Sequence, residues 1–242
     1  MYEASDRRPK NRLLRALPDE DYRRLAPALR TMTVAKGFVF FQPNTPVDYV
    51  YFPNGGVTSV TTVLADGSTV ETATVGSEGM VGLEALLTED AVAPGEVMVQ
   101  VGDIEVEQLS AGAFRSELAR NGALAHVVGR YAQVLIAQMM QSAACNARHQ
   151  IQERCARWLL MTHDRVARDE FDLSHEFLAT MLGVRRQSVT VVAGELQSAG
   201  LITYRHGTIR ILDRKRLETA SCECYALVRE KFDSSFEGQL TL

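Results

Sequence analysis

Residues 175–194 read HEFLATMLGVRRQSVTVVAG, and this stretch decides the fold because it has the spacing of two short, crossed helices. Apolar residues recur where such helices bury side chains against each other, at Leu178, Leu182, Val184, Val189 and Val192. Ala179 lies where the helices approach most closely, and Gly183 lies where the turn needs a positive φ. With Ser174 as N-cap, the stretch predicts a helix-turn-helix. An ordinary αα-hairpin would share the apolar spacing but need not combine it with Ala179 and Gly183.

The second helix of this motif, predicted over residues 186–199, carries the candidate reading face. Its exposed N-terminal positions are Arg185, Arg186, Gln187, Ser188 and Thr190. Arginine can bridge guanine O6 and N7, and glutamine can pair with adenine, so these residue types suit entry into a DNA major groove.

Residues 200–212, GLITYRHGTIRIL, follow directly and predict two short strands around the turn His206-Gly207. We expect Arg205, His206 and the hydroxyl of Thr208 to contact phosphate, and Ile209 and Ile211 to close a small core. A further short strand is expected at residues 171–173. Together these elements make a winged helix-turn-helix.

The part of the chain before this motif changes from helical to strand-like patterning. Short helices fit the apolar spacing between residues 11 and 32. From residue 37 to 109, short β-rich runs alternate with turn residues, which indicates a barrel or sandwich. The runs are residues 38–41, 49–52, 57–63, 69–75, 97–101 and 104–109.

A long helix is predicted over residues 121–146, which contain no proline. Within this helix a row of residues recurs in steps of three and four, which keeps the row on one side. Such a row, here called the seam, is expected for a helix that pairs with its own copy. We therefore assign this seam to dimerisation: Leu124, Val128, Tyr131, Leu135, Gln138 and Ser142, with Cys145 at its end. The alternative is that the helix only packs on its own barrel, although Val127, Val134 and Met139 supply a second apolar face for that contact.

The composition is that of a cytoplasmic protein, and the charges divide the chain into an acidic and a basic segment. The 242 residues are 46% hydrophobic, enough for two modest cores, and no apolar run has the length of a secretion signal or membrane span. Residues 36–110 hold eleven acidic side chains and one basic one, whereas residues 146–216 hold twelve basic and eight acidic. The first segment repels polyanions, and the second attracts them.

The order of barrel, long helix and winged helix resembles the Crp/Fnr superfamily, over about residues 11–218. The most specific matches are FLATMLGVRRQSVT at residues 177–190, LQSAGLI at 196–202, and VGSEGMVG at 75–82, which looks like the segment that precedes the family's phosphate-binding cassette. The resemblance implies a homodimer that binds a two-fold-related promoter site and acts on RNA polymerase.

Several departures from the family pattern argue against the effectors that known branches of the family bind: a cyclic nucleotide, an iron–sulfur cluster or haem. Cyclic-nucleotide binders of the family carry Gly-Glu in the cassette and an arginine soon after, but here Gly82 is followed by Leu83 and no arginine occurs between Lys36 and Arg115. The oxygen-sensing branch needs N-terminal cysteines and the haem-binding branch an axial histidine in the barrel, whereas the first cysteine is Cys145 and the first histidine is His126.

We expect neither cofactor nor metal. The four cysteines should be reduced thiols without disulfides. Cys222 and Cys224 could hold a soft metal or take part in redox sensing, but the sequence places no third and fourth ligand near them, and His149, His163 and His206 fit helix surfaces or the wing. No enzyme motif is present, so an enzyme is not expected.

The sequence therefore predicts an α+β chain with a cyclic-nucleotide-binding-like β-barrel (jelly roll), a long dimerisation helix and a C-terminal winged helix-turn-helix. The corresponding ranges are 11–120, 121–146, 147–218 and a C-terminal extension, 219–242. The expected function is sequence-specific DNA binding as a homodimeric transcription regulator, with an unidentified small-molecule effector as a further partner. The alternative is a ligand sensor that acts mainly through protein contacts with RNA polymerase or a partner regulator.

Overall fold

The computed structural model describes residues 8–236 of the chain, and its N-terminal part is a set of short helices as predicted. The helices are α1 (Arg12–Arg15), α2 (Asp19–Leu25) and the 3-10 helix η1 (Ala26–Ala28). The side chain of Asn11 accepts hydrogen bonds from the backbone of Leu13 and Leu14, which starts α1. The helical region ends earlier than predicted, because a strand begins at Arg30.

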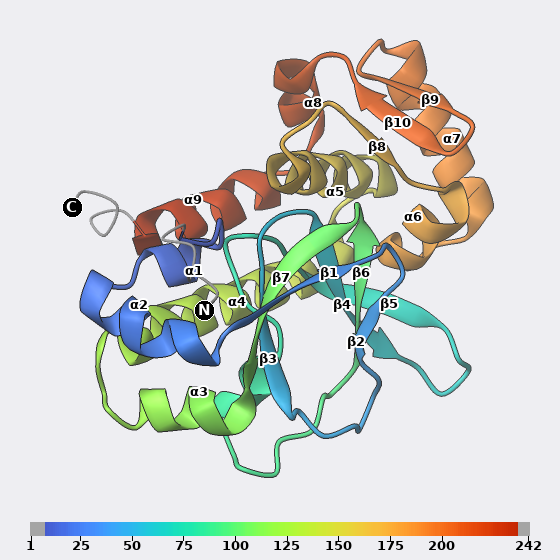
Figure 1. Ribbon diagram of the computed structural model, residues 1–242. Coiled ribbons are helices and arrows are strands. Elements are labelled where there is room, and N and C mark those ends of the chain that lie inside the picture. The colour runs from blue at the N-terminus through green and yellow to red at the C-terminus, as the bar shows by residue number, and fades with distance from the viewer. Residues whose placement is uncertain (1–7, 237–242) are drawn as a thin grey trace.

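A barrel of two antiparallel sheets follows, with strand orders β1-β7-β3 and β2-β6-β4-β5 (Figure 1). The strands are β1 (Arg30–Val34), β2 (Val39–Phe41), β3 (Tyr49–Pro53), β4 (Val57–Val63), β5 (Thr69–Val75), β6 (Glu96–Val101) and β7 (Ile104–Ser110). All six predicted strands are confirmed, with small shifts at their ends. Strand β1 escaped prediction because only Val34 of its five residues is buried, which leaves no apolar run to detect.

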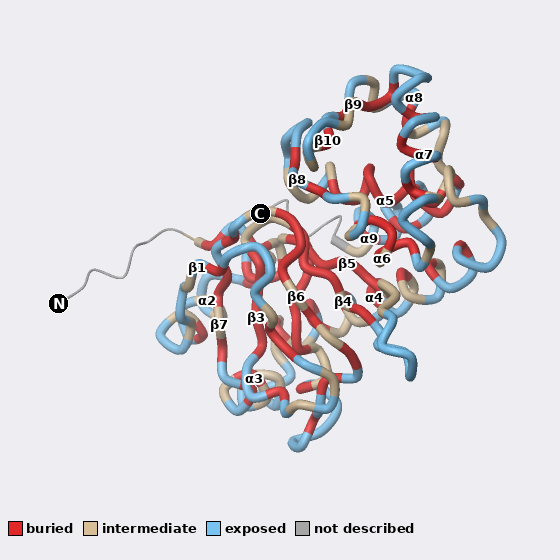
Figure 2. Tube along the Cα trace, turned by 90° about the vertical axis from the view of Figure 1, so that its right-hand side faces the viewer, coloured by how far each residue is buried: buried red, intermediate tan, exposed pale blue. Residues whose placement is uncertain are grey.

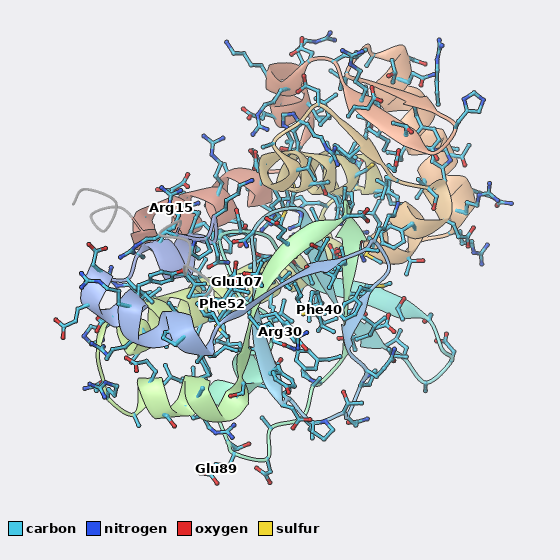
Figure 3. All side chains as sticks on the ribbon, viewed as in Figure 1. Arg15, Arg30, Phe40, Phe52, Glu89 and Glu107 are labelled. Carbon is cyan, nitrogen blue, oxygen red and sulfur yellow. The ribbon has the colours of Figure 1, made fainter. Side chains whose placement is uncertain are left out.

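Much of each barrel strand is buried (Figure 2), and most of the buried side chains of the barrel are apolar. Phe52, Val99, Val106 and Leu109 are fully buried there. Figure 3 shows Phe52 among the barrel side chains and the exposed Glu89 on an outer loop. That loop follows the 3-10 helix η2 (Leu83–Leu86).

Helix α3 (Ala111–Leu118) leads from the barrel into α4 (Ala123–Arg148), the long helix, which packs along β5. The C-terminal part then begins with α5 (Ile151–Val166), and its other elements are β8 (Glu170–Asp172), α6 (His175–Leu182), α7 (Arg186–Ser198), β9 (Ile202–Arg205), β10 (Thr208–Ile211), α8 (Arg214–Ala220) and α9 (Cys224–Phe236). Strands β8, β10 and β9 form one sheet in that order. This arrangement confirms the predicted α+β fold class.

Two C-terminal helices were not anticipated as separate elements. The expected boundary after residue 218 falls inside α8, and α9 folds back onto α4 and α5 (Figure 1). The last six residues of the expected extension, 237–242, lie outside the described residues. Within residues 8–236, no helix combines the length and apolarity needed to cross a bilayer.

Candidate nucleic-acid interface

Helices α6 and α7 meet at a tight turn whose ends are fixed as predicted. Ser174 Oγ accepts a 3.2 Å hydrogen bond from the backbone N–H of Phe177, which caps the start of α6. Gly183 has a φ of 61°, and its N–H donates to the carbonyl of Thr180 at 3.1 Å. A side chain at this position would be strained, so glycine is what allows the sharp change of direction.

The contact between the two helices is apolar and closely packed. Ala179 is buried at the crossing, and Val184 packs against the core while partly exposed. The other predicted contact residues are all buried: Leu178, Leu182, Val189 and Val192. The guanidinium of Arg154 on α5 donates to the carbonyl of Leu182, so α5 holds the end of α6. Helix α7 is therefore held against α5 and α6.

The N-terminal end of α7 presents the predicted reading residues. Arg185, Arg186 and Gln187 are exposed, and Ser188 is partly buried. Thr190 is exposed, but its hydroxyl donates to the carbonyl of Arg186 at 3.2 Å and lies 3.1 Å from Nδ1 of His175. Thr190 therefore fastens α7 to the start of α6, and Arg185, Arg186 and Gln187 remain the groups that reach outward.

Arg186 has only a weak partner within the protein. Its Nε lies 3.8 Å from the carboxylate of Glu176, and the two side chains are 68% and 77% exposed. Exposed ion pairs of this kind contribute about 0–1 kcal/mol, so Glu176 constrains the Arg186 side chain only weakly.

The wing is formed by β9 and β10, which pair around a two-residue turn. His206 and Gly207 both have positive φ, 49° and 85°, as a hairpin turn of this length requires. Arg205 and His206 are exposed at the tip, whereas the hydroxyl of Thr208 donates to Asp172 at 2.8 Å. Of the three predicted phosphate contacts, Arg205 and His206 therefore point to solvent, whereas the hydroxyl of Thr208 is engaged within the protein. The predicted burial of Ile209 and Ile211 is confirmed.

The wing is also tied to the helix-turn-helix. The ring of His175 stacks on Tyr204, with centroids 4.1 Å apart, and Tyr204 donates its N–H to Gln197 Oε1 at 2.8 Å. These contacts fix the wing relative to helices α6 and α7.

Two domain models match the chain in the order that the fold shows. Residues 31–121 match the cyclic nucleotide-binding domain, and residues 153–220 match the Crp-like helix-turn-helix domain. The chain belongs to the Crp/Fnr family of transcription regulators. This family consists of DNA-binding regulators and not of enzymes, and the helix-turn-helix is the DNA-binding domain of this member.

Solved structures of Crp/Fnr proteins have the same fold. A regulator from Eubacterium rectale has a TM-score of 0.68 at 20% identity, over 86% of this chain and 96% of that one. FixK2 from Bradyrhizobium japonicum has 0.67 at 17%, over 80% and 98%. A CRP family regulator from Thermus thermophilus has 0.66 at 23%, over 78% and 96%. No curated protein matches the sequence.

The long helix of this Crp/Fnr regulator corrects our dimer assignment. The predicted seam is buried within the chain itself: Leu124, Val128, Tyr131, Leu135, Gln138 and Ser142 all lie against the molecule's own core or barrel. Tyr131 donates its hydroxyl to the carbonyl of Met80, and Gln138 donates to the carbonyl of Thr74. The seam is thus unavailable to a second copy, and the alternative contact with the barrel is the one that forms.

A second side of α4, next to the buried seam, carries apolar residues that are exposed or partly exposed. Ile136 and Met140 are 56% and 68% exposed, and Ala132 and Ala143 extend the same stripe in steps of three and four residues. We name Ala132, Ile136, Met140 and Ala143 the α4 stripe.

A cavity lies between α4 and strands of the segment that matches the cyclic nucleotide-binding domain. It has a volume of about 370 Å³ and is lined by residues that include Glu71, Glu84, Met139 and Ser142. Burial raises the pKa of Glu84 above its usual value. None of its described lining residues is an arginine, lysine or histidine. The cavity therefore offers carboxylates and no cation to a phosphate.

We expect cyclic AMP and cyclic GMP to bind this regulator no tighter than about millimolar, because nothing in the cavity offsets desolvation of the phosphate. Isothermal titration calorimetry on the full chain measures this directly. Micromolar binding by either nucleotide would show that a group outside the cavity, such as Arg130 of α4, supplies the clamp.

The barrel contacts the DNA-binding domain through a carboxylate. Glu71 on β5 accepts a 2.8 Å hydrogen bond from Trp158 Nε1 on α5 and another from Ser59 Oγ. Burial raises the pKa of Glu71 to about 7, although both hydrogen bonds and the charges of Arg157 and Arg165 oppose the rise. A second link joins Arg165 Nε to Glu78 at 2.7 Å.

We expect the raised pKa of Glu71 to make the folded state less stable as pH rises toward and through 7. The unfolded carboxyl ionises near its usual pKa, whereas the folded one resists ionisation, so the stabilisation present at low pH is lost on deprotonation. Wild type should lose about 1–3 kcal/mol more than Glu71→Gln between pH 5 and pH 8. Denaturant unfolding at both pH values measures the difference. Glu89→Gln, at an exposed carboxylate, serves as control, and equal losses in all three proteins would contradict the account.

The cysteine cluster is the feature that our sequence interpretation missed. All four cysteines are reduced and buried, which agrees with the expected thiols. Cys222 and Cys224, however, do have a third and a fourth potential ligand, because Cys145 of α4 and His149, which directly follows α4, lie beside them. The expectation that no such ligands are near was wrong. The Cys145 to His149 spacing of one helical turn, together with the pair Cys222-Glu223-Cys224, was the signal available in the sequence.

Proposed function

We propose that the protein is a homodimeric transcription regulator that inserts α7 into the major groove at two related half-sites of one DNA site. The observation that carries the proposal is the exposed set Arg185, Arg186 and Gln187 at the N-terminal end of α7, which packs against α5 and α6. These residue types recognise base edges, whereas Arg205 and His206 of the wing contact phosphate.

Dimerisation proceeds through the α4 stripe and not through the buried seam. Residues 131–147 contain no charged side chain, so a second copy of α4 can approach without burying a charge. Large exposed apolar residues on a long helix favour pairing with another helix. The two helix-turn-helix units of such a dimer would read a two-fold-related site.

The acidic barrel restricts the way in which DNA approaches. Its segment 36–110 holds eleven carboxylates against one lysine, so the duplex is repelled there and attracted by the basic segment 146–216. The surface that DNA does not cover is available to RNA polymerase, the partner that family membership suggests. The regulator acts in the cytoplasm, where its DNA is.

Fluorescence anisotropy with a promoter fragment tests the proposal. Affinity should fall steeply with salt and should exceed that for random DNA by about 10³-fold or more. Equal affinity for both DNAs would contradict sequence-specific regulation and favour a role through protein contacts.

A further inference from the structure

Four potential metal ligands come together where α4 ends and α8 gives way to α9. They are Cys145, His149, Cys222 and Cys224, and their ligand atoms all lie within 4.8 Å of one another. The three cysteines are buried and form a small cluster separate from the main core. His149 follows Cys145 by one helical turn, while Cys222 and Cys224 come from the turn between α8 and α9. Two segments more than 70 residues apart thus supply two ligands each.

The spacing of the ligand atoms fits a single tetrahedral ion. Cys145 Sγ lies 3.5 Å from Cys222 Sγ, and Cys224 Sγ lies 3.5 Å from His149 Nδ1. Bonds of about 2.3 Å from zinc to sulfur and about 2.0 Å to nitrogen place tetrahedral ligands about 3.5–3.8 Å apart. An iron–sulfur cluster would need its ligands farther apart, because several iron and sulfide atoms lie between them.

The surrounding residues have the arrangement of an outer ligand shell. His149 turns Nδ1 toward Cys224, and its Nε2 lies 3.3 Å from the carboxylate of Glu223. A metal-binding histidine commonly donates its second N–H to a carboxylate, which leaves the other nitrogen free to ligate. Gln141, one turn before Cys145 on α4, donates to Cys224 Sγ at 2.9 Å, as suits a thiolate.

Buried positive charge lies nearby. Three thiolates with one divalent ion leave one net negative charge. Arg154 and Arg157 are buried on α5, within electrostatic reach of Cys145, and the Nε of each has no hydrogen-bond partner among the described residues. Buried cations without full compensation are costly, and an anionic metal centre offsets that cost.

We propose that Cys145, His149, Cys222 and Cys224 bind one Zn²⁺ per chain. A set of three thiolates and one imidazole with tetrahedral spacing is typical of structural zinc. A disulfide between Cys145 and Cys222 would use only two of the four residues and would not account for the orientation of His149 and Glu223. The ion joins the C-terminal end of α4 to the turn before α9, beside the α4–α5 junction that connects barrel and DNA-binding domain. The proposal stands apart from the DNA-binding function, since it concerns metal content alone.

Metal analysis of the full chain purified with reductant tests the proposal. Wild type should contain about one zinc per chain by mass spectrometry. Cys222→Ser and Cys224→Ser should contain little or none. The matched controls are Cys155→Ala, a buried cysteine on α5 outside the cluster, and His126→Ala, an exposed histidine elsewhere on α4; both should keep the full content.

Cobalt substitution keeps the test valid if the cysteine variants fail to fold. Wild-type chain stripped of zinc and titrated with Co²⁺ should give the intense visible bands of a tetrahedral thiolate site, saturating at one ion per chain. His149→Ala should weaken binding or change these bands. Reduced wild type that neither contains zinc nor binds Co²⁺ would overturn the proposal. So would stoichiometric iron with sulfide, or a Cys145–Cys222 disulfide in protein purified with reductant.

Discussion

The double variant Ile136→Asp, Met140→Asp is expected to be monomeric and to lose most of its affinity for a two-fold DNA site. Both side chains lie on the α4 stripe and are more than half exposed, so the substitutions leave the core of the chain intact. In a dimer they would place four carboxylates in one apolar contact, which is strongly unfavourable. Sedimentation velocity measures the oligomeric state, and circular dichroism verifies that the variant remains folded.

The expected loss of DNA affinity is about 10²–10⁴-fold, because a monomer loses the gain that comes from linking two half-site contacts. Leu87→Asp is the matched control, since Leu87 is 77% exposed and lies outside α4. Leu87→Asp should stay dimeric and bind normally. A dimeric double variant would show that the α4 stripe is not the interface.

Leu135→Asp distinguishes the stripe from the buried seam. Leu135 is only 6% exposed, and an unpaired carboxylate there would destabilise the fold itself. Leu135→Asp should therefore lose thermal stability, whereas substitution of the neighbouring Ile136 by Asp should lose the dimer.

Arg186→Ala is expected to weaken binding to the specific site by about 1–3 kcal/mol and to relax the preference at one base pair in each half-site. Arg186 is exposed at the start of α7 and has only the weak contact with Glu176, so removing it leaves the protein's own structure unchanged. Val191, five residues further along α7, is 61% exposed and apolar, so its side chain can donate no hydrogen bond to a base.

Arg205→Ala in the wing provides the comparison for Arg186→Ala. A phosphate contact carries no sequence information, so this variant should weaken binding to all sequences alike and should reduce the salt slope by roughly one. An unchanged base preference in Arg186→Ala would assign Arg186 to a phosphate as well.

The elements that were predicted correctly are those with local signals. The turn at Gly183, the cap at Ser174 and the hairpin at His206-Gly207 each depend on a few adjacent residues with well-defined backbone requirements. The regular strands of the barrel were equally visible, since each strand is bounded by turn residues. Strand β1 had no such signal, because four of its five residues are not buried.

The long helix shows the limit of periodicity. The spacing of Leu124, Tyr131 and Gln138 revealed correctly that one side of α4 is buried, but the pattern does not specify the partner. Polar Gln138 indicated that this partner is the chain's own barrel, since its amide donates a hydrogen bond to the carbonyl of Thr74. The apolar α4 stripe was harder to see because half of it consists of alanines.

The metal cluster could not be assembled from the sequence, because its two halves meet only through the packing of α9 against α4. Helix α9 itself was not expected, so Cys222 and Cys224 had no predicted neighbours. The sequence also could not show that Thr190 and Thr208, two predicted DNA contacts, are engaged within the protein. Their hydroxyls bond to protein groups that only the fold brings near.

Selection of binding sites from a pool of random duplexes by the full chain tests whether the protein is a dimeric, sequence-specific regulator. We expect an enriched inverted repeat with half-site centres about one helical turn apart, or a multiple of it, bound by two chains. Each half-site should contain a guanine whose enrichment is lost in Arg186→Ala. Enrichment of a single half-site without its repeat, or no enrichment over the starting pool, would contradict a dimeric sequence-specific regulator.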